Sequence, residues 1–268
     1  MHSAAQEKVF DFRILGPIEF HVSGRPVPVP GARQRALLCL LLLESGRTMT
    51  AARLIDGIWG ERPPETAAAQ LRICVSRLRK LLAASGLPGS ISTETGGYRL
   101  QAPEGCVDVQ RFGGLLREAA DAESGGRRAD AAALLREGLA LWRGPAADGL
   151  ESPAVRAAAA QLDEERVAAL ERYFDLEIQL GRHHPVIPEL MSCAAAHPFR
   201  EQLHCHLMLA LYRAGRQVEA LQAYRELKRR FADELGIEPS LPLRIMETKI
   251  LGQNPELSGG QSVQLLAG

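Results

Sequence analysis

The stretch from Glu65 to about Ala84 holds the side chains whose types and spacing favour contact with a nucleic acid. Placed on a helix at about 100° per residue, its leucines, Cys74 and Val75 collect on one face. Apart from Ile73, the opposite face and its flanks are small, polar or basic, and no acidic residue follows Glu65 in this stretch. The polar and basic members are Thr66, Gln70, Arg72, Ser76, Arg77, Arg79 and Lys80.

Such a face suits the major groove of DNA. Arginine can donate two hydrogen bonds to guanine O6 and N7, whereas glutamine, serine and threonine reach bases or phosphates. Several cations also neutralise phosphates, which makes the affinity depend on salt. The same pattern is typical of the solvated face of an ordinary amphipathic helix, so the neighbouring elements decide between the two interpretations.

Those elements predict an α+β winged helix-turn-helix over residues 10–102. A platform of three short strands comes first, and the prolines of the third make it an edge strand; the strands are residues 10–15, 18–22 and 25–29. Two helices, residues 33–44 and 51–58, precede the basic helix, and an extended link of residues 48–50 joins them. Thr50 caps the second of these helices. A hairpin of residues 91–95 and 98–101 follows and would form the wing.

Beyond Pro103 the strand patterns stop, and residues 112–251 read as helices throughout. Gly126, Gly181 and Gly215 each precede an apolar helical run, and the last two are 34 residues apart, which is the tetratricopeptide period. We therefore predict an all-α, tetratricopeptide-like domain over residues 106–252. Residues 253–268 are rich in Gly, Ser and Gln and are expected to form a flexible tail.

Charge and cysteine usage limit the class of protein. The net charge is zero, but residues 1–105 hold 13 basic against 9 acidic side chains, and the remainder holds 19 against 23. The five cysteines include no CxxC pair, which indicates free thiols in a reducing cytosol. No signal-peptide pattern is present, and the apolar run 36–43 is too short to cross a bilayer. We expect a cytoplasmic protein without membrane contact.

Several motifs, in order along the chain, resemble the Streptomyces antibiotic regulatory protein family. Those of the front half are FRILGP at 12–17, RQRALL at 33–38, LIDGIWG at 54–60, VSRLRK at 75–80 and GYRL at 97–100. Those of the back half are LWRGP at 141–145, ALYRAGRQ at 210–217 and ELGIEP at 234–239. The resemblance covers about residues 10–251 and implies an OmpR/PhoB-like winged helix joined to a bacterial transcriptional activation domain.

The resemblance also implies what the chain does. It implies a sequence-specific activator, associated with the nucleoid, that binds direct repeats near the −35 region of a secondary-metabolite, or antibiotic, gene cluster. Two protomers would lie side by side on double-stranded promoter DNA and contact the RNA polymerase holoenzyme, including its sigma factor. Neither enzymatic activity nor a cofactor is implied.

Carried onto this sequence, the family's recognition motif makes Arg77 the base contact and Arg79 and Lys80 phosphate contacts. Weaker candidates on the same helix are Thr66, Gln70, Arg72 and Ser76. Arg33 and Arg35 open the first helix and can bind phosphate with help from its N-terminal dipole, although solvated charge explains them equally well. In the wing the candidates are Thr93, Thr95 and Tyr98. Glu94 departs from the family pattern, because a carboxylate there would face phosphates unless it turns away.

Other interpretations compete with DNA reading. A tetratricopeptide-like scaffold without specific DNA binding would use only the helical half. A metal enzyme would need the histidines and cysteines between residues 183 and 206, but they supply no evident set of four ligands, so we expect no metal site. No GxxxxGK[ST] nucleotide-binding motif is present, which fits a small family member as well as a fragment of a larger one.

Overall fold

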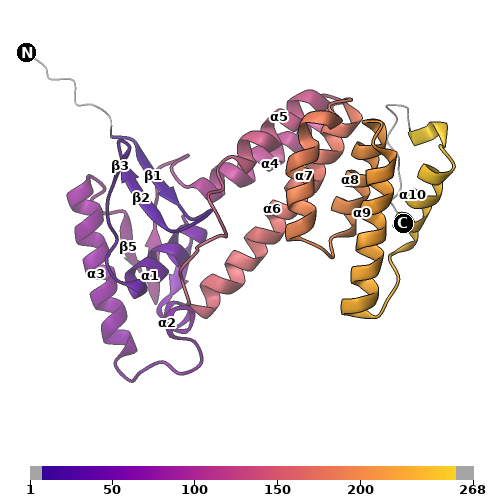
Figure 1. Cartoon of the computed structure of the whole chain (residues 1–268). Coiled ribbons are helices and arrows are strands. Elements are labelled where there is room, and N and C mark those ends of the chain that lie inside the picture. The colour runs from indigo at the N-terminus through magenta and orange to yellow at the C-terminus, as the bar shows by residue number, and fades with distance from the viewer. Residues whose placement is uncertain (1–7, 258–268) are drawn as a thin grey trace, which may run out of the picture. The chain divides into compact units, whose positions relative to one another are not determined.

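The computed structural model describes residues 8–257 and separates into two compact units (Figure 1). The first contains residues up to 117 together with 137–166, and the second contains 118–136 and the chain from 167 onward. Within the described part, no helix is both long and apolar enough to cross a membrane.

The first unit begins with an antiparallel sheet in the order β1 (Phe10–Arg13), β2 (Glu19–Val22) and β3 (Arg25–Pro26). Phe12 pairs with Phe20 across the first two strands, and their rings stack at 4.4 Å. The predicted first strand ran to residue 15 and is too long. Its last two amides, those of Ile14 and Leu15, donate to the carboxylate of Asp108 instead of to a neighbouring strand.

Three helices and a second sheet complete the winged helix. The helices are α1 (Ala32–Leu43), α2 (Ala51–Trp59) and α3 (Ala67–Ser85). The sheet has the order β4 (Thr48–Thr50), β6 (Gly97–Leu100) and β5 (Ile91–Glu94). Thr50 caps α2 as predicted, because its Oγ1 accepts a hydrogen bond from the Arg53 amide at 3.2 Å. The extended link is a strand of the wing sheet, which the sequence did not predict.

The core of the first unit extends past residue 102. It includes Cys106 and Val107, then Ala147, Leu150 and Val155 from the segment around the start of α6 (Pro153–Gln179). Packing is therefore continuous through the domain boundary that the sequence predicts at residues 102–106, and that boundary stays a prediction.

Asp108 opens α4 (Asp108–Ser124) and is 1% exposed. Its carboxylate accepts hydrogen bonds from the amides of Ile14 and Leu15 at 2.9 Å and from its neighbour Val109 at 2.8 Å. The side chain thus ties the end of β1 to the first turn of α4.

The prediction of helices throughout residues 112–251 is wrong for residues 140–152, which lie between α5 (Arg128–Leu139) and α6. Their backbone follows the end of β1 instead. The amide of Arg143 donates to the Leu15 carbonyl at 2.9 Å, and the amide of Ala147 donates to the Ile14 carbonyl at 2.8 Å. Long-range pairing has replaced the local helix.

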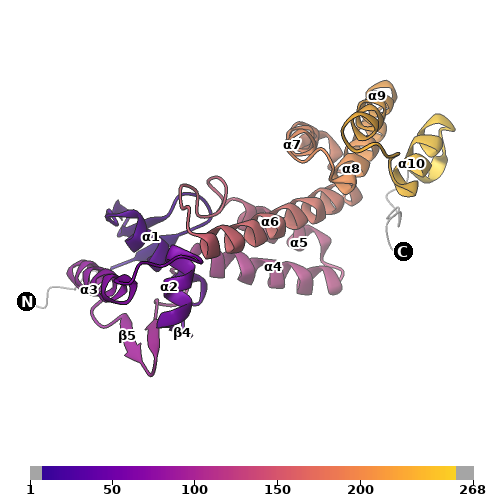
Figure 2. The same ribbon diagram turned by 90° about the horizontal axis from the view of Figure 1, so that it is seen from below.

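The second unit is helical and contains α7 (His183–Ala196), α8 (Glu201–Arg213), α9 (Gln217–Arg230) and α10 (Leu241–Leu251). Figures 1 and 2 both show α7, α8 and α9 side by side. A single π-turn, Phe231–Leu235, continues α9. Of the predicted tail, Pro255–Leu257 forms a 3₁₀ turn with Leu257 fully buried, and residues 258–268 lie outside the described part.

The predicted repeat glycines occupy equivalent turns. Gly126, Gly181 and Gly215 have φ values of +75°, +76° and +75°. In each case the following amide donates to the carbonyl five residues earlier, at 2.8 to 2.9 Å. This is the Schellman arrangement that ends a helix, and it needs the left-handed backbone that glycine adopts without strain.

Candidate nucleic-acid interface

The two predicted faces of α3 are present in the structure. Leu71, Cys74, Val75, Leu78 and Leu82 are buried, and Leu81 is half-buried. The outer face exposes Thr66, Arg72, Ile73, Ser76, Arg77 and Lys80. Among residues 8–257, no acidic side chain pairs with Arg72, Arg77 or Lys80. Three cations of this face therefore remain available to an anionic ligand.

The outer face is also held close to the start of α1. Arg33 Nη1 donates to Gln70 Oε1 at 2.8 Å, and Gln70 Nε2 donates to Thr66 Oγ1 at 2.8 Å. The Arg33 guanidinium lies 5.5 Å from the Trp59 ring centroid, an arrangement that favours a cation. Arg33, Gln70 and Thr66 thus form one polar row beside the outer face.

Two cations act on the same buried thiol. Burial raises the pKa of Cys74, and the nearby charges of Arg33 and Arg77 lower it. Arg33, Cys74 and Arg77 line the same hollow between α1 and α3. Arg35, the other candidate on α1, is half-buried and forms no side-chain hydrogen bond or ion pair within the described residues.

Arg79, predicted as a phosphate contact, has its guanidinium bound to the hairpin. Its Nε donates to the Ile91 carbonyl at 2.9 Å, and its Nη2 donates to Thr93 Oγ1 at 2.7 Å. The same group lies 5.9 Å from the Tyr98 ring centroid. Arg79 therefore joins α3 to the wing, and its contact with a phosphate stays a prediction.

The wing, whose tip projects from the helices of the first unit in Figure 2, is formed by β5 and β6. Glu94 does not present a free carboxylate: its Oε1 accepts from Arg99 Nη2 at 2.8 Å and from Ser92 Oγ at 2.7 Å. Thr93 and Thr95 are exposed, and Tyr98 is half-buried. The negative charge of Glu94, which departs from the family pattern, is therefore neutralised by Arg99 within the hairpin.

Gly97 is required where the wing meets β4. A Cβ at this position would collide with the Met49 carbonyl, because Gly97 pairs with Thr50 in the sheet. The absence of a side chain allows the two strands to approach, so this glycine fixes the base of the wing.

Sequence reasoning did not assign Ile73, Arg99 or Asp108 to any role. Ile73 was visible as an apolar residue on a polar face. The partners of Arg99 and Asp108 lie on other elements, so periodicity within their own segments carries no signal for them.

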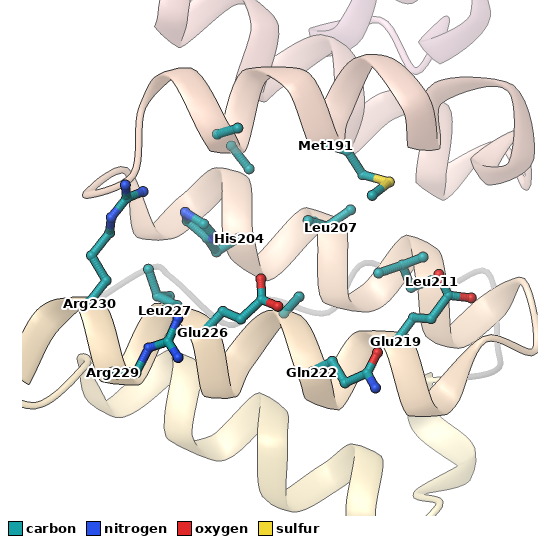
Figure 3. Close-up of a pocket in the computed structure, with 13 residues that line it drawn as sticks. Met191, His204, Leu207, Leu211, Glu219, Gln222, Glu226, Leu227, Arg229 and Arg230 are labelled. Carbon is teal, nitrogen blue, oxygen red and sulfur yellow. The ribbon is translucent and has the colours of Figure 1, made fainter.

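The second unit has a hollow over α8, between α7 and α9 (Figure 3). Its apolar lining includes Met191, Leu207 and Leu211, and charged side chains of α9 stand along the rim. Burial lowers the pKa of His204, which also lines it. Glu226 and Arg229 on the rim form no ion pair within the described part of the chain. Within residues 8–257, no group of three or more His, Cys, Asp or Glu side chains is placed so that it could hold a metal ion.

Comparison with known proteins matches both halves of the chain. Residues 107–251 match the family model described as bacterial transcriptional activator domain, and residues 27–100 match transcriptional regulatory protein, C terminal. Regulatory protein DnrI of Streptomyces peucetius is 33% identical over 90% of this chain and 92% of its own length. Regulatory protein AfsR of Streptomyces coelicolor is 42% identical over 92% of this chain.

The chain spans only 25% of the length of that AfsR protein. A solved structure, Mycobacterium tuberculosis EmbR in complex with a low-affinity phosphopeptide, superposes with a TM-score of 0.87 at 36% sequence identity. The superposition covers 94% of this chain and 69% of the EmbR chain. The relatives are named as regulatory proteins, and the fold of the part of EmbR that superposes is the one described above.

Proposed function

Because this chain belongs to the Streptomyces antibiotic regulatory protein family of transcriptional regulators, we propose that it is a sequence-specific activator that reads promoter DNA through α3. The DNA-binding domain would span residues 10–102 and the activation domain residues 106–252. The observation that carries the proposal is the exposed, unpaired Arg77 at the centre of a face without carboxylates.

Each group of the interface has a distinct task in this proposal. Arg77 donates to guanine in the major groove, with Ser76 beside it, while Arg72 and Lys80 neutralise phosphates. Arg33 and Arg35, at the start of α1, contact the DNA phosphate backbone. Gln70 and Trp59 hold Arg33 in position for this contact. The exposed threonines of the wing reach a neighbouring phosphate, and Arg79 and Tyr98 hold the wing in position.

The finer parts of the proposal concern arrangement and partners. Two protomers would lie side by side on direct repeats near the −35 region of an antibiotic gene cluster, in the cytoplasm. The helical half would contact RNA polymerase holoenzyme, including its sigma factor. The unpaired Glu226 and Arg229 beside the apolar hollow support a protein-contact role for that half.

The test is selection of binding sites from random duplex DNA with the full chain, followed by affinity measurements at fixed salt. Arg77→Ala should weaken binding to the selected site by about 1–3 kcal/mol, or roughly 5- to 150-fold, and relax the preference at one base pair. The control is Arg25→Ala, which removes an exposed cation that belongs to β3 and not to α3.

Unchanged affinity of the Arg77→Ala variant would refute the assignment of the reading residue. Selection of no sequence at all by the wild-type chain would favour the alternative, a tetratricopeptide-like scaffold without specific DNA binding. Capture of RNA polymerase on the selected DNA, with and without sigma factor, would then test the proposed partner separately.

A further inference from the structure

Ile73 stands out on the outer face of α3 because it is the large apolar side chain there and is 50% exposed. Neither the core nor helix formation requires it. The core of the first unit is supplied by the opposite face of α3, and isoleucine favours a helix less than alanine, lysine or arginine does. A single exposed apolar residue is ordinary on a protein surface, but this one lies amid groups suited to hydrogen bonding with DNA.

Ile73 lies beside a hollow of the first unit. It lines a hollow between α1 and α3 together with Gly31, Arg33, Gln70 and Arg77. The Arg33–Gln70 hydrogen bond, at 2.8 Å, fixes one side of this hollow. An isoleucine on a helix also has one strongly preferred χ1 rotamer. This preference limits the conformational entropy that is lost when the exposed methyl groups are covered.

The chemistry of the major groove identifies what would cover them. Thymine is the base that presents a methyl group there, whereas the other bases present hydrogen-bonding groups at that edge. We propose that Ile73 reads a thymine methyl group close to the base pair read by Arg77. This inference rests on the proposed function and adds a specificity determinant to it.

The spacing of the two residues limits where that thymine lies. Arg77 follows Ile73 by four positions, a rise of about 6 Å along the helix, and successive base pairs are about 3.4 Å apart. The thymine should therefore lie within two base pairs of the guanine that Arg77 contacts. An apolar residue on α3 thus predicts a feature of the binding site.

The test replaces each thymine of the selected site by deoxyuridine, which removes the methyl group and leaves the base pairing intact. For the wild-type chain, one replacement per half-site should weaken binding about fourfold, the value of one buried methylene-sized group. The Ile73→Ala variant should bind the unmodified site at least about fourfold more weakly than the wild-type chain does. Its affinity should not change further when that thymine is replaced by deoxyuridine. Val9→Ala, which truncates another exposed apolar side chain of the first unit, should respond as the wild type does.

Three results would overturn the inference. They are a wild-type chain indifferent to every deoxyuridine, an Ile73→Ala variant that responds as strongly as the wild type, or a selected site without thymine within two base pairs of the guanine. If Arg77→Ala still weakens binding to the selected site and relaxes the preference at one base pair in those cases, the proposed function survives without this detail. If the wild-type chain selects no sequence, the proposed function fails and this inference fails with it.

Discussion

Replacement of Asp108 by alanine should destabilise the first unit far more than the loss of a surface carboxylate would. The side chain is 1% exposed, and its carboxylate satisfies the buried amides of Ile14 and Leu15 at 2.9 Å. Each buried donor left without a partner costs about 1–3 kcal/mol. With two such donors, the expected loss is about 2–6 kcal/mol, a large part of the roughly 5–15 kcal/mol that stabilises a typical domain.

Urea unfolding followed by tryptophan fluorescence measures this loss selectively. Both tryptophans of the chain, Trp59 and Trp142, belong to the first unit, so the signal reports its unfolding. Asp56→Ala is the matched control, because that aspartate is exposed on α2, and its free energy of unfolding should change by less than about 0.5 kcal/mol. A loss below about 1 kcal/mol for Asp108→Ala would refute the reasoning, because each unsatisfied donor alone should cost that much.

The ionisation of Asp108 adds a pH dependence with a definite sign. Burial raises the pKa of this carboxyl, although the amide hydrogen bonds and Arg143 lower it in part. Since the pKa of Asp108 is raised in the folded state, the contribution that this shift makes to the free energy of unfolding is fully present below the pKa of the unfolded chain, about 3.9. It is lost as the pH rises through the folded-state pKa. The penalty of Asp108→Asn should therefore be smaller at pH 7 than at pH 4; a larger penalty at pH 7 would mean that the hydrogen bonds outweigh burial.

Two further predictions concern the wing. Arg79→Ala removes the hydrogen bonds to Ile91 and Thr93, which should cost about 1 kcal/mol and accelerate hydrogen exchange of the β5 and β6 amides about fivefold. The control variant Lys80→Ala should leave that exchange unchanged, and equal exchange rates in the two variants would contradict the anchoring role of Arg79. Gly97→Ala places a Cβ against the Met49 backbone and should lower the free energy of unfolding in urea by about 3 kcal/mol. In the control variant Gly96→Ala the new Cβ meets no atom within 4 Å, so the variant should lose only about 1–2 kcal/mol from the strain of its positive φ. An equal loss of unfolding free energy in the two variants would show that β4 and β6 separate easily.

The sequence by itself determined the elements whose signals are local. The separation of apolar from basic residues on α3 depends only on a helical period, and the structure confirms both faces. The same holds for the Thr50 cap and for the turns at Gly181 and Gly215, because each uses groups within a few residues of one another. Motif order was sufficient to indicate the family, and the comparisons confirm it.

Only the tertiary structure decided which groups remain free to bind. Arg77 and Arg79 are two residues apart and chemically alike, yet Arg79 is bound to a hairpin that approaches from another part of the chain, and Arg77 is not. Residues 140–152 lost their predicted helix to backbone partners at the end of β1, more than 120 positions away. Such partners are chosen by packing of the whole unit, and no periodicity within a segment encodes which distant backbone group will meet it.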